Sequence, residues 1–435
     1  ILSAFVSMRD AERSLDRTPG PLRRATHKIR PGFDFSAVVP VNKRFGFTIS
    51  ASASTLYRAQ DFSQNTWRGS GSATNGTTFP DTTPDRPYLS DYAVRDGGAL
   101  ATAGSIGATL DFRLSRYDQL SFTLQWAYSD FAQSTRQLTF FTNGVTPGDF
   151  APTYTHGRPG AGEIRITNTS NDLGGNLYMP TLTYRHNGPS WQAEAGAGHS
   201  QSMRRRVDAN NGYFFNSQAQ RQNVTVSFDE IFYLRPGKIT VTDGPTGTPI
   251  DPYRLDNYTL NSVSTNAAEA IDLQQTAYAN LRRSFNGAVP FTLKSGLDLR
   301  RQKRDSRNTN PTLTFVGNDG RPNTSDDNAR VVLDELFSQR TAPYGFPKVQ
   351  WTSNEELWDI YKSSPQFFTG NQTASHTREV ALSRHAEERV SAAFIRGDAT
   401  LLKGKLKLVG GLRAEQTNVD VEGALTDPTR NFQRD

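Results

Sequence analysis

The segment at residues 118–131, DQLSFTLQWAYSDF, alternates strictly between apolar and polar side chains. Its apolar members stand at the even positions, and they are Leu120, Phe122, Leu124, Trp126 and Tyr128. Successive side chains of a strand point to opposite faces, so a period of two predicts a strand with one apolar face. Such a face either packs on the core of a soluble protein or contacts lipid from the wall of a membrane barrel.

The same pattern recurs in five predicted strand pairs, each joined by a polar turn of two to four residues. The pairs are 27–39 with 44–59, 102–114 with 119–131, 176–186 with 191–202, 275–285 with 290–302, and 389–402 with 405–419. Turns that contain Asn-Gly or Gly supply the positive φ that hairpins need. A single strand at 1–8 opens the chain, which makes eleven predicted strands.

Long polar segments separate the pairs. They are 9–26, 60–101, 132–175, 203–274 and 303–388. Loops longer than about 15 residues are uncommon in compact domains, whereas membrane barrels combine short periplasmic turns with long extracellular loops. The alternation therefore favours a transmembrane β-barrel, and a large soluble antiparallel β-protein remains the alternative.

Residues on the two strand faces are assigned to lipid and to lumen by parity. The predicted lipid-facing residues are Phe122, Leu124, Trp126, Tyr128, Phe291 and Leu293. The predicted lumen-facing residues are Asp298, Arg300, Arg396, Asp398, Arg413 and Glu415. Charges of both signs are costly in a dry core unless they are paired, but they cost little beside a hydrated lumen.

Composition narrows the function classes. The mean hydropathy is −0.61 and no stretch approaches the about 18 apolar residues of a transmembrane helix, but barrel strands are only partly apolar. The absence of cysteine excludes disulfides and cysteine nucleophiles. A net charge of +6 from 49 basic and 43 acidic residues gives no broad basic surface for nucleic acid. The six histidines are scattered, no catalytic arrangement emerges, and we expect no enzyme.

The longest loop carries three local predictions. Helical spacing of apolar residues predicts helices at 327–340 and 353–364, the second capped by Ser353 or Asn354. The segment GNDGRPNTSDD offers Asp319, Asp326 and Asp327 as oxygen ligands for Ca²⁺. Its spacing differs from the EF-hand pattern, so an Asx-rich turn is the alternative, and we expect no other cofactor.

Two basic runs, at 204–206 and 300–304, follow predicted strands where they would leave the membrane on the outer side. Cations at this level are suited to the phosphates of lipopolysaccharide. Solvated strand extensions are the alternative.

The stretch AAFIRGDATLLKGKLKLVGGLRAEQTNV at 392–419 joins two strands through a tight turn and ends in Gly-Leu-Arg-Ala-Glu. This hairpin resembles one from the barrel region of TonB-dependent outer-membrane receptors. Supporting stretches lie at 180–198 and 79–92. The resemblance implies a barrel of 22 strands around a plug domain, of which residues 1–435 would form about half, without the plug, the TonB-contacting box and the remaining strands. We therefore expect an internal fragment with a curved, unclosed sheet that is not a functional unit alone.

The resemblance also implies a function and partners. Such a receptor lies in the bacterial outer membrane, binds a scarce large solute at its extracellular loops, and imports it with energy from the TonB complex. Solutes in the family include siderophores, cobalamin and oligosaccharides, and the sequence does not select among them. A passive porin, an autotransporter-type barrel and a soluble β-rich carbohydrate-binding protein are the alternatives.

Overall fold

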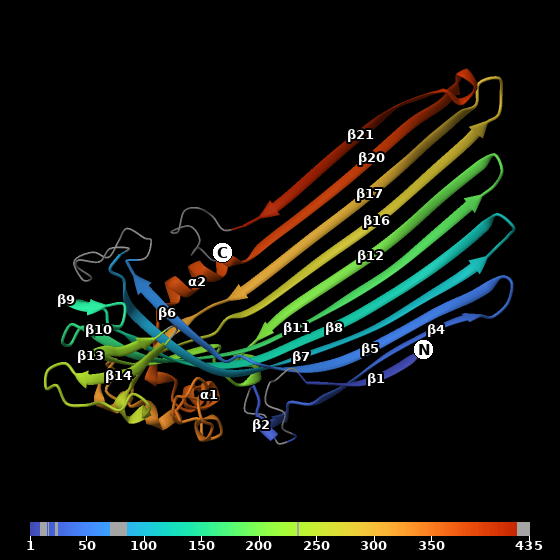
Figure 1. Cartoon of the computed structure of the whole chain (residues 1–435). Coiled ribbons are helices and arrows are strands. Elements are labelled where there is room, and N and C mark those ends of the chain that lie inside the picture. The colour runs from blue at the N-terminus through green and yellow to red at the C-terminus, as the bar shows by residue number, and fades with distance from the viewer. Residues whose placement is uncertain (9–14, 16, 22–24, 70–84, 233–234, 424–435) are drawn as a thin grey trace.

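The computed structural model describes residues 1–8, 15, 17–21, 25–69, 85–232 and 235–423. It confirms an all-β fold, in which antiparallel strands form one large sheet (Figure 1). Eleven strands succeed one another across the sheet in chain order: β1 (Leu2–Ser7), β4 (Arg30–Pro40), β5 (Phe45–Ala59), β7 (Tyr88–Arg113), β8 (Asp118–Phe141), β11 (Gly162–Asn187), β12 (Trp191–Val207), β16 (Ala267–Phe285), β17 (Phe291–Thr309), β20 (Arg384–Leu401) and β21 (Leu406–Glu422). These are the eleven strands that the alternation predicts.

The five predicted hairpins are confirmed, and local interactions or backbone conformations suited to tight turns are found in their connections. In the β4–β5 turn, Asn42 Oδ1 accepts hydrogen bonds from the backbone N–H groups of Arg44 and Phe45 at 2.8 and 2.9 Å. In the β20–β21 turn, Leu402 and Lys403 adopt positive φ, and Gly404 follows them. The short polar turns therefore fix each hairpin locally.

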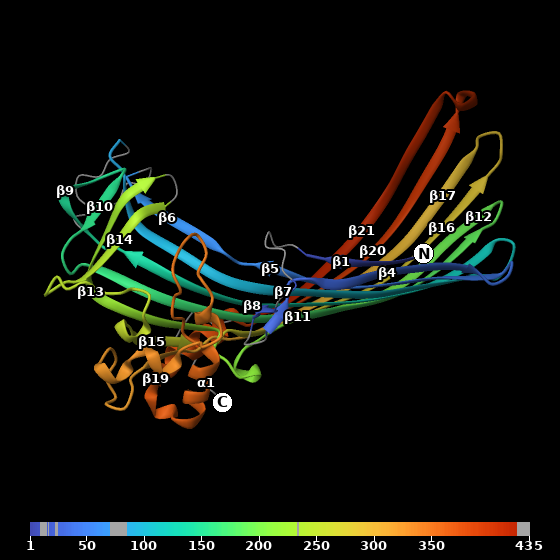
Figure 2. The same ribbon diagram turned by 60° about the horizontal axis from the view of Figure 1, so that its bottom comes forward.

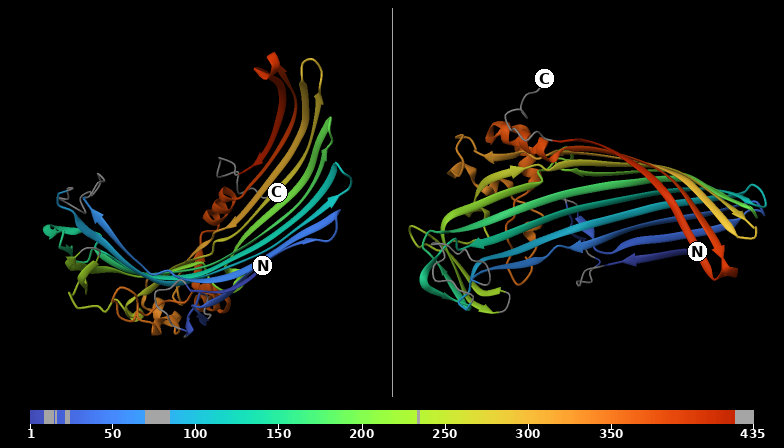
Figure 3. Two further views of the ribbon diagram at one scale, coloured as in Figure 1. Left: turned by 45° about the vertical axis from the view of Figure 1, so that its right-hand side comes forward. Right: turned by 90° about the horizontal axis from the view of Figure 1, so that it is seen from above.

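The sheet is curved and does not close (Figure 3). Its edges are β1 and β21, and within the described residues neither edge pairs with a further strand. Every residue of β21 is exposed. The expected curved, unclosed sheet is confirmed. The described residues form no closed barrel, and a barrel of 22 strands stays a prediction.

The predicted boundaries of the long loops are wrong, because several hairpins continue as strand well past the apolar stretches. The β7–β8 ladder runs without a break from Arg113 opposite Gln119 to Asp91 opposite Phe141. Further strands fill the remaining segments: β2 (Arg17–Pro19), β3 (Ala25–His27), β6 (Phe62–Arg68), β9 (Val145–Ala151), β10 (Tyr154–Gly157), β13 (Asn216–Phe232), β14 (Arg235–Asp243), β15 (Thr259–Ser264), β18 (Thr312–Phe315) and β19 (Phe368–Gly370). Residues 9–14, 16, 22–24 and 70–84 of the predicted loops, and with them part of 79–92, lie outside the described residues.

Residues 317–367 form a compact body that we call the lobe (Figure 2). The predicted helix at 353–364 is confirmed as α1 (Asn354–Ser363), and the Ser353 hydroxyl accepts a hydrogen bond from the Glu356 N–H at 3.1 Å. The helix predicted at 327–340 is wrong. Extended backbone at Leu333 and its bridge to Thr352 interrupt this segment, which forms only the 3₁₀ turns η4 (Ala329–Val332) and η5 (Phe337–Gln339) after η3 (Ser325–Asp327).

A second helix, α2 (Gln372–Leu382), is not expected from the sequence, because its few apolar side chains give no marked stripe. Its first turn is capped by Asn371, whose Oδ1 accepts from the Ala374 N–H at 2.9 Å. Residues 365–367 form the 3₁₀ turn η6 (Pro365–Phe367). No helix in the described part of the chain reaches the length and hydropathy that crossing a bilayer would require.

The main hydrophobic core lies between the lobe and the extended ends of β7, β8, β11 and β13. The sheet contributes Tyr92, Val94, Leu138, Phe140, Ile164 and Ile166, and the lobe contributes Val332, Phe337, Val349, Trp351 and Leu357. The lobe lies on the convex side of the wall, over these far ends of the strands (Figure 3). Apolar burial therefore holds the lobe against this part of the sheet.

We expect Trp351→Ala to destabilise the lobe by about 3–5 kcal/mol, because truncating a fully buried tryptophan leaves a cavity. The chain contains no cysteine, so a dye on a Val331→Cys variant, where the native side chain is 61% exposed, reports the urea midpoint of the lobe. Leu336→Ala, at a half-exposed control position, should cost less than about 1 kcal/mol. Equal midpoints for the two variants would contradict this packing.

Candidate functional site

The candidate functional surface is the strand wall itself, which has one apolar and one charged face. The predicted apolar residues stand opposite one another across the ladders, for example Leu110, Phe122 and Leu182 on β7, β8 and β11. The six predicted lipid-facing residues all share this face. Other apolar side chains on the same face are Ile49, Ile106, Phe112, Tyr178, Leu281, Leu297, Leu299, Ile395, Leu408 and Leu412, all exposed. Together they form the apolar band.

The apolar band is solvent-exposed in this structure: Leu297 is 59% exposed and Leu299 is 53% exposed. A contiguous apolar surface of this kind marks contact with a membrane or with another protein. A soluble sandwich would cover it with a second layer of sheet or helix. In the described residues no such layer lies over the band, because the lobe covers only the far ends of the strands.

The opposite face carries the six predicted lumen-facing residues, since Asp298, Arg300, Arg396, Asp398, Arg413 and Glu415 all share its parity. Several pair two residues along one strand. Arg396 Nη2 contacts Asp398 Oδ1 at 2.7 Å, and Arg413 Nε contacts Glu415 Oε2 at 3.2 Å. Arg300 instead pairs across the ladder with Glu388 at 3.1 Å. The predicted residues are thus brought onto one charged face, which is the concave one, opposite the lobe.

The lobe contacts the same face as the apolar band. The β7–β8 and β8–β11 ladders keep their register throughout, so Tyr92 and Ile164 share the parity of Leu110 and Leu182. Between the band and the core under the lobe lies a polar belt, which consists of Asp96, Ser134, Arg136, Asn168 and Ser170. All five are buried. The wall therefore has an apolar, a polar and a second apolar zone on its convex face.

The lobe supplies hydrogen-bond and ion-pair partners to part of the polar belt. The Arg136 guanidinium pairs with Asp334, with the two side chains 1% and 5% exposed, and lies 3.7 Å above the Phe337 ring. Asn168 Nδ2 donates to the Thr352 carbonyl at 2.6 Å, and Asn354 Nδ2 donates to Ser170 Oγ at 3.2 Å. These contacts connect residues more than 180 positions apart, so no local sequence pattern announces them.

Asp96 and Arg340 form the second ionic contact between wall and lobe. Arg340 Nε lies 3.5 Å from Asp96 Oδ1, and Arg340 Nη2 lies 3.6 Å from Asp61 Oδ2. Burial raises the pKa of Asp96 to about 6, although the Arg340 guanidinium beside it acts in the opposite direction. The folded protein therefore favours a proton on this carboxyl at mildly acidic pH.

The long loop containing the lobe does not lie over the charged face as a single cover. The lobe packs on the convex side, whereas α2 lies on the concave side (Figures 1 and 3). There Asn308 Nδ2 on β17 donates to the Leu382 carbonyl at 2.7 Å. The loop is thus divided between the two faces.

The three predicted calcium ligands lie in one turn, and backbone N–H groups donate to one carboxylate oxygen of each. Asp326 Oδ2 accepts from the N–H groups of Asn318 and Asp319 at 2.8 and 3.2 Å. Asp327 Oδ2 accepts from the Thr324 N–H at 2.9 Å, and Asp319 Oδ1 from the Arg321 N–H at 2.8 Å. In the described residues no three acidic, histidine or cysteine side chains are arranged to hold a metal. The geometry is that of an Asx-rich turn, and calcium binding stays a prediction.

The two basic runs are divided between the faces by strand alternation. Arg205 and Arg301 lie on the face of the apolar band, beyond its outer end, where Arg205 approaches Glu269 at 4.0 Å and Arg301 pairs with Glu387 at 3.0 Å. Arg204 and Arg300 lie on the charged face. Binding of lipopolysaccharide phosphates stays a prediction for Arg205 and Arg301.

Histidine contacts are a feature that the sequence did not reveal. His156 bridges two carboxylates, with Nδ1 at 2.8 Å from Asp149 and Nε2 at 3.0 Å from Asp229. Burial alone would lower the pKa of His156, but the hydrogen bonds to Asp229 and Asp149 outweigh it and raise the pKa. Asp229 is 73 residues away in sequence, so only the tertiary fold brings the bridge together.

The buried carboxyl of Asp96 predicts a pH dependence of lobe docking. The pKa of an aspartate carboxyl rises from about 3.8 to about 6 on folding. Protonation of Asp96 therefore stabilises the docked lobe, and this contribution to the free energy of unfolding is complete below pH 4. The contribution, at most about 3 kcal/mol, is lost as the pH rises through 6. The urea midpoint of the lobe, measured with the dye at position 331, should be higher at pH 5 than at pH 7.5.

Asp96→Asn should flatten this dependence, because the amide does not titrate. Asp359→Asn, at an exposed surface position paired with Lys362, serves as the control and should retain it. If the wild-type midpoint is the same at both pH values, the raised pKa of Asp96 is wrong.

No family model matches this sequence, and no curated protein matches it either. The strand wall, with its exposed apolar band, its charged concave face and its open edges, is the feature of the molecule that bears on function.

Proposed function

We propose that this chain forms part of the wall of an outer-membrane β-barrel of the TonB-dependent receptor kind, which imports a large solute. The apolar band would contact lipid, and the charged concave face would line a hydrated lumen. The short turns would lie on the periplasmic side, and the strand extensions with the lobe on the extracellular side. Energy would come from the TonB complex through a part of the receptor outside this chain.

The observation that carries the proposal is the apolar band, which crosses the wall without a break of register and has a charged face behind it. With no protein layer over the band in the described residues, this alternation suits a wall that has lipid on one face and water on the other. A soluble protein that exposed the same band would aggregate or bind a partner. The lengths of the central strands suit a tilted strand that spans the bilayer in about 9–11 residues and continues beyond it.

The open edges support a larger barrel. Unpaired N–H and C=O groups at a sheet edge are not tolerated in hydrocarbon, so a wall in lipid requires partners for β1 and β21. The eleven strands are half of the 22 that plugged receptors contain. The hairpin of β20 and β21, which carries the resemblance to that family, lies at one edge, where the wall would continue.

Uptake assays in cells distinguish active import from passive diffusion. Ferric siderophores, cobalamin and oligosaccharides are supplied to cells with and without a working TonB complex, and cells that lack the protein serve as the background. Uptake of one solute that requires both the protein and the TonB complex supports the proposal. Uptake that is independent of TonB would instead identify a passive pore.

Neighbouring positions on β17 test the assignment of the faces. Leu297→Arg places a cation in the apolar band and should cost about 2–4 kcal/mol near the middle of the bilayer. Asp298→Arg introduces the same side chain on the charged face and should be tolerated. The measurement is the amount of folded protein in the outer-membrane fraction. Equal loss for both variants, or no loss for either, would contradict the assignment.

A further inference from the structure

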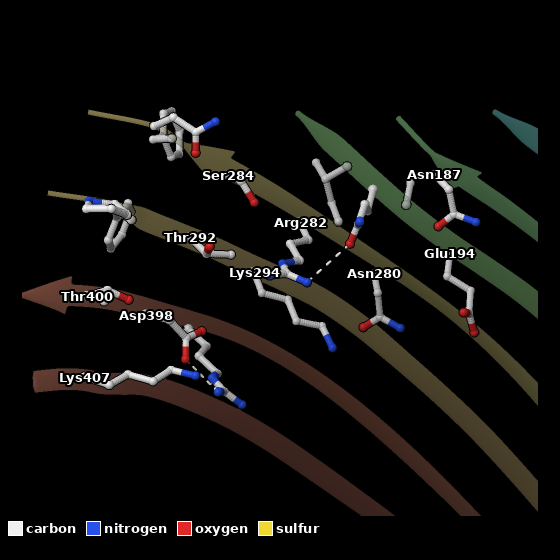
Figure 4. A pocket seen from close by; sticks show the side chains of 18 of the residues that line it. Asn187, Glu194, Asn280, Arg282, Ser284, Thr292, Lys294, Asp398, Thr400 and Lys407 are labelled. Carbon is white, nitrogen blue, oxygen red and sulfur yellow. Dashed lines mark hydrogen bonds and ion pairs between the residues drawn. The ribbon is translucent and has the colours of Figure 1, made fainter. Parts of the chain in front are cut away.

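A row of cations crosses the charged face near the turns that join β11 to β12 and β16 to β17. Arg282 on β16 stands directly opposite Lys294 on β17, and Lys294 stands directly opposite Arg396 on β20. At one end of the row, Gln192 on β12 faces Arg282 and accepts a hydrogen bond from its Nη1 at 3.3 Å. Figure 4 shows Arg282 and Lys294 side by side on adjacent strands, with Lys407 of β21 nearby.

The two carboxylates near this row each have an arginine partner, and for Asp398 this partner is Arg396 of the row itself. Glu194 Oε2 lies 3.2 Å from Arg185 Nε, and its Oε1 accepts from the Tyr278 hydroxyl at 2.7 Å. Asp398 is paired with Arg396 at 2.7 Å. Among the described residues, no carboxylate lies within ion-pair distance of Arg282, Lys294 or Lys407. The site therefore holds an excess of positive charge.

This arrangement is unfavourable for the wall alone. Like charges directly opposite one another across a ladder are destabilising. Arg282 opposite Lys294 is such a pair, whereas Asp398 compensates the charge of Arg396 opposite Lys294. A neutral polar side chain at either position would suit a hydrated face without the repulsion between the two cations. An anion placed between the cations removes the repulsion and makes charge-assisted hydrogen bonds to several of them.

The row lines a hollow that has room for such an anion. Its volume is about 680 Å³, and hydroxyl and amide groups complete its lining, among them Asn280, Ser284, Thr292 and Thr400 (Figure 4). A small molecule with several carboxylates or phosphates would meet three cations and neutral hydrogen-bonding groups together.

We propose that Arg282, Lys294 and Lys407 form a binding site for a small solute that carries several carboxylate or phosphate groups. The inference rests on the proposed function in taking the charged face as the lumen, and it adds the chemical class of the solute. The site lies near the turns, so in the proposed orientation the solute would meet it close to the periplasmic exit.

Binding is measured on the intact protein, purified in detergent, by titration calorimetry with citrate and with tripolyphosphate at low salt. The neutral trisaccharide raffinose is the comparison ligand. We expect both anions to bind, with an affinity that falls as salt is added, and raffinose not to bind. Equal binding of raffinose, or no binding of either anion, would overturn the proposal.

The double variant Arg282→Gln with Lys294→Gln should weaken anion binding at least about tenfold, since each removes a charge-assisted contact. Lys303→Gln is the matched control, because it removes the same charge from the same strand but on the opposite face. It should change affinity less than about twofold. Lys294→Arg keeps the charge and should retain binding. An unchanged affinity in the double variant would overturn the assignment of the residues.

Failure of this inference can be told apart from failure of the proposed function. If the anions bind through Arg282 and Lys294 but no solute enters in a TonB-dependent manner, the site stands and active import is wrong. If TonB-dependent uptake is found but the double variant binds and imports as the wild type does, import stands and the anion site is wrong.

Discussion

The structure depends on cross-strand register that continues unbroken over long antiparallel ladders. The β7–β8 ladder holds one register along its whole length, and β8–β11 does the same. A slip of one residue would exchange the two faces of a strand, so Leu110 and Asp111 would trade environments. Because the register is kept, one face of the whole wall remains apolar and the other charged. The candidate lipid surface and the candidate lumen are thus two consequences of a single pattern of backbone hydrogen bonds.

The same parity also explains where the lobe lies. Beyond the apolar band, the convex face becomes polar at Asp96, Arg136 and Asn168 and then apolar again at Tyr92 and Ile164. Without the lobe, the second apolar zone would be exposed to water. The lobe covers this zone, and its Asp334 pairs with Arg136 of the polar belt. The polar belt, with its buried charges, separates the second apolar zone from the apolar band. Protein therefore suits this zone better than lipid as a cover. In the proposed orientation the lobe would then stand outside the barrel wall, above the membrane, and the lumen would keep α2 on its side.

Local patterns in the sequence predict the hairpins and the faces, because both depend on neighbours within one strand pair. The cap of α1 was equally local, since Ser353 and Glu356 are three residues apart. The strand extensions were missed because Gly97, Gly98, Ser134 and Thr135 interrupt the apolar alternation, and only pairing across the ladder keeps them extended. The apolar spacing of 327–340 predicts a helix, but the bridge of Leu333 to Thr352 competes with the helix and leaves only turns. Contacts such as Arg136 to Asp334 depend on the tertiary fold.

The cation row is likewise only partly predictable from local sequence patterns. The position of Arg282 opposite Lys294 follows from a single hairpin. The position of Lys294 opposite Arg396 depends on the register between β17 and β20, and a long connection separates these two strands. Lys407 lies on β21, whose outer edge is unpaired within the described residues. In a closed barrel the next strand would lie beside Lys407 and would form the far side of the hollow. A carboxylate there would neutralise the excess charge, while a further cation or a hydroxyl would keep the site selective for anions. The strand that closes the wall at β21 therefore sets the charge of the lumen as well as the integrity of the barrel.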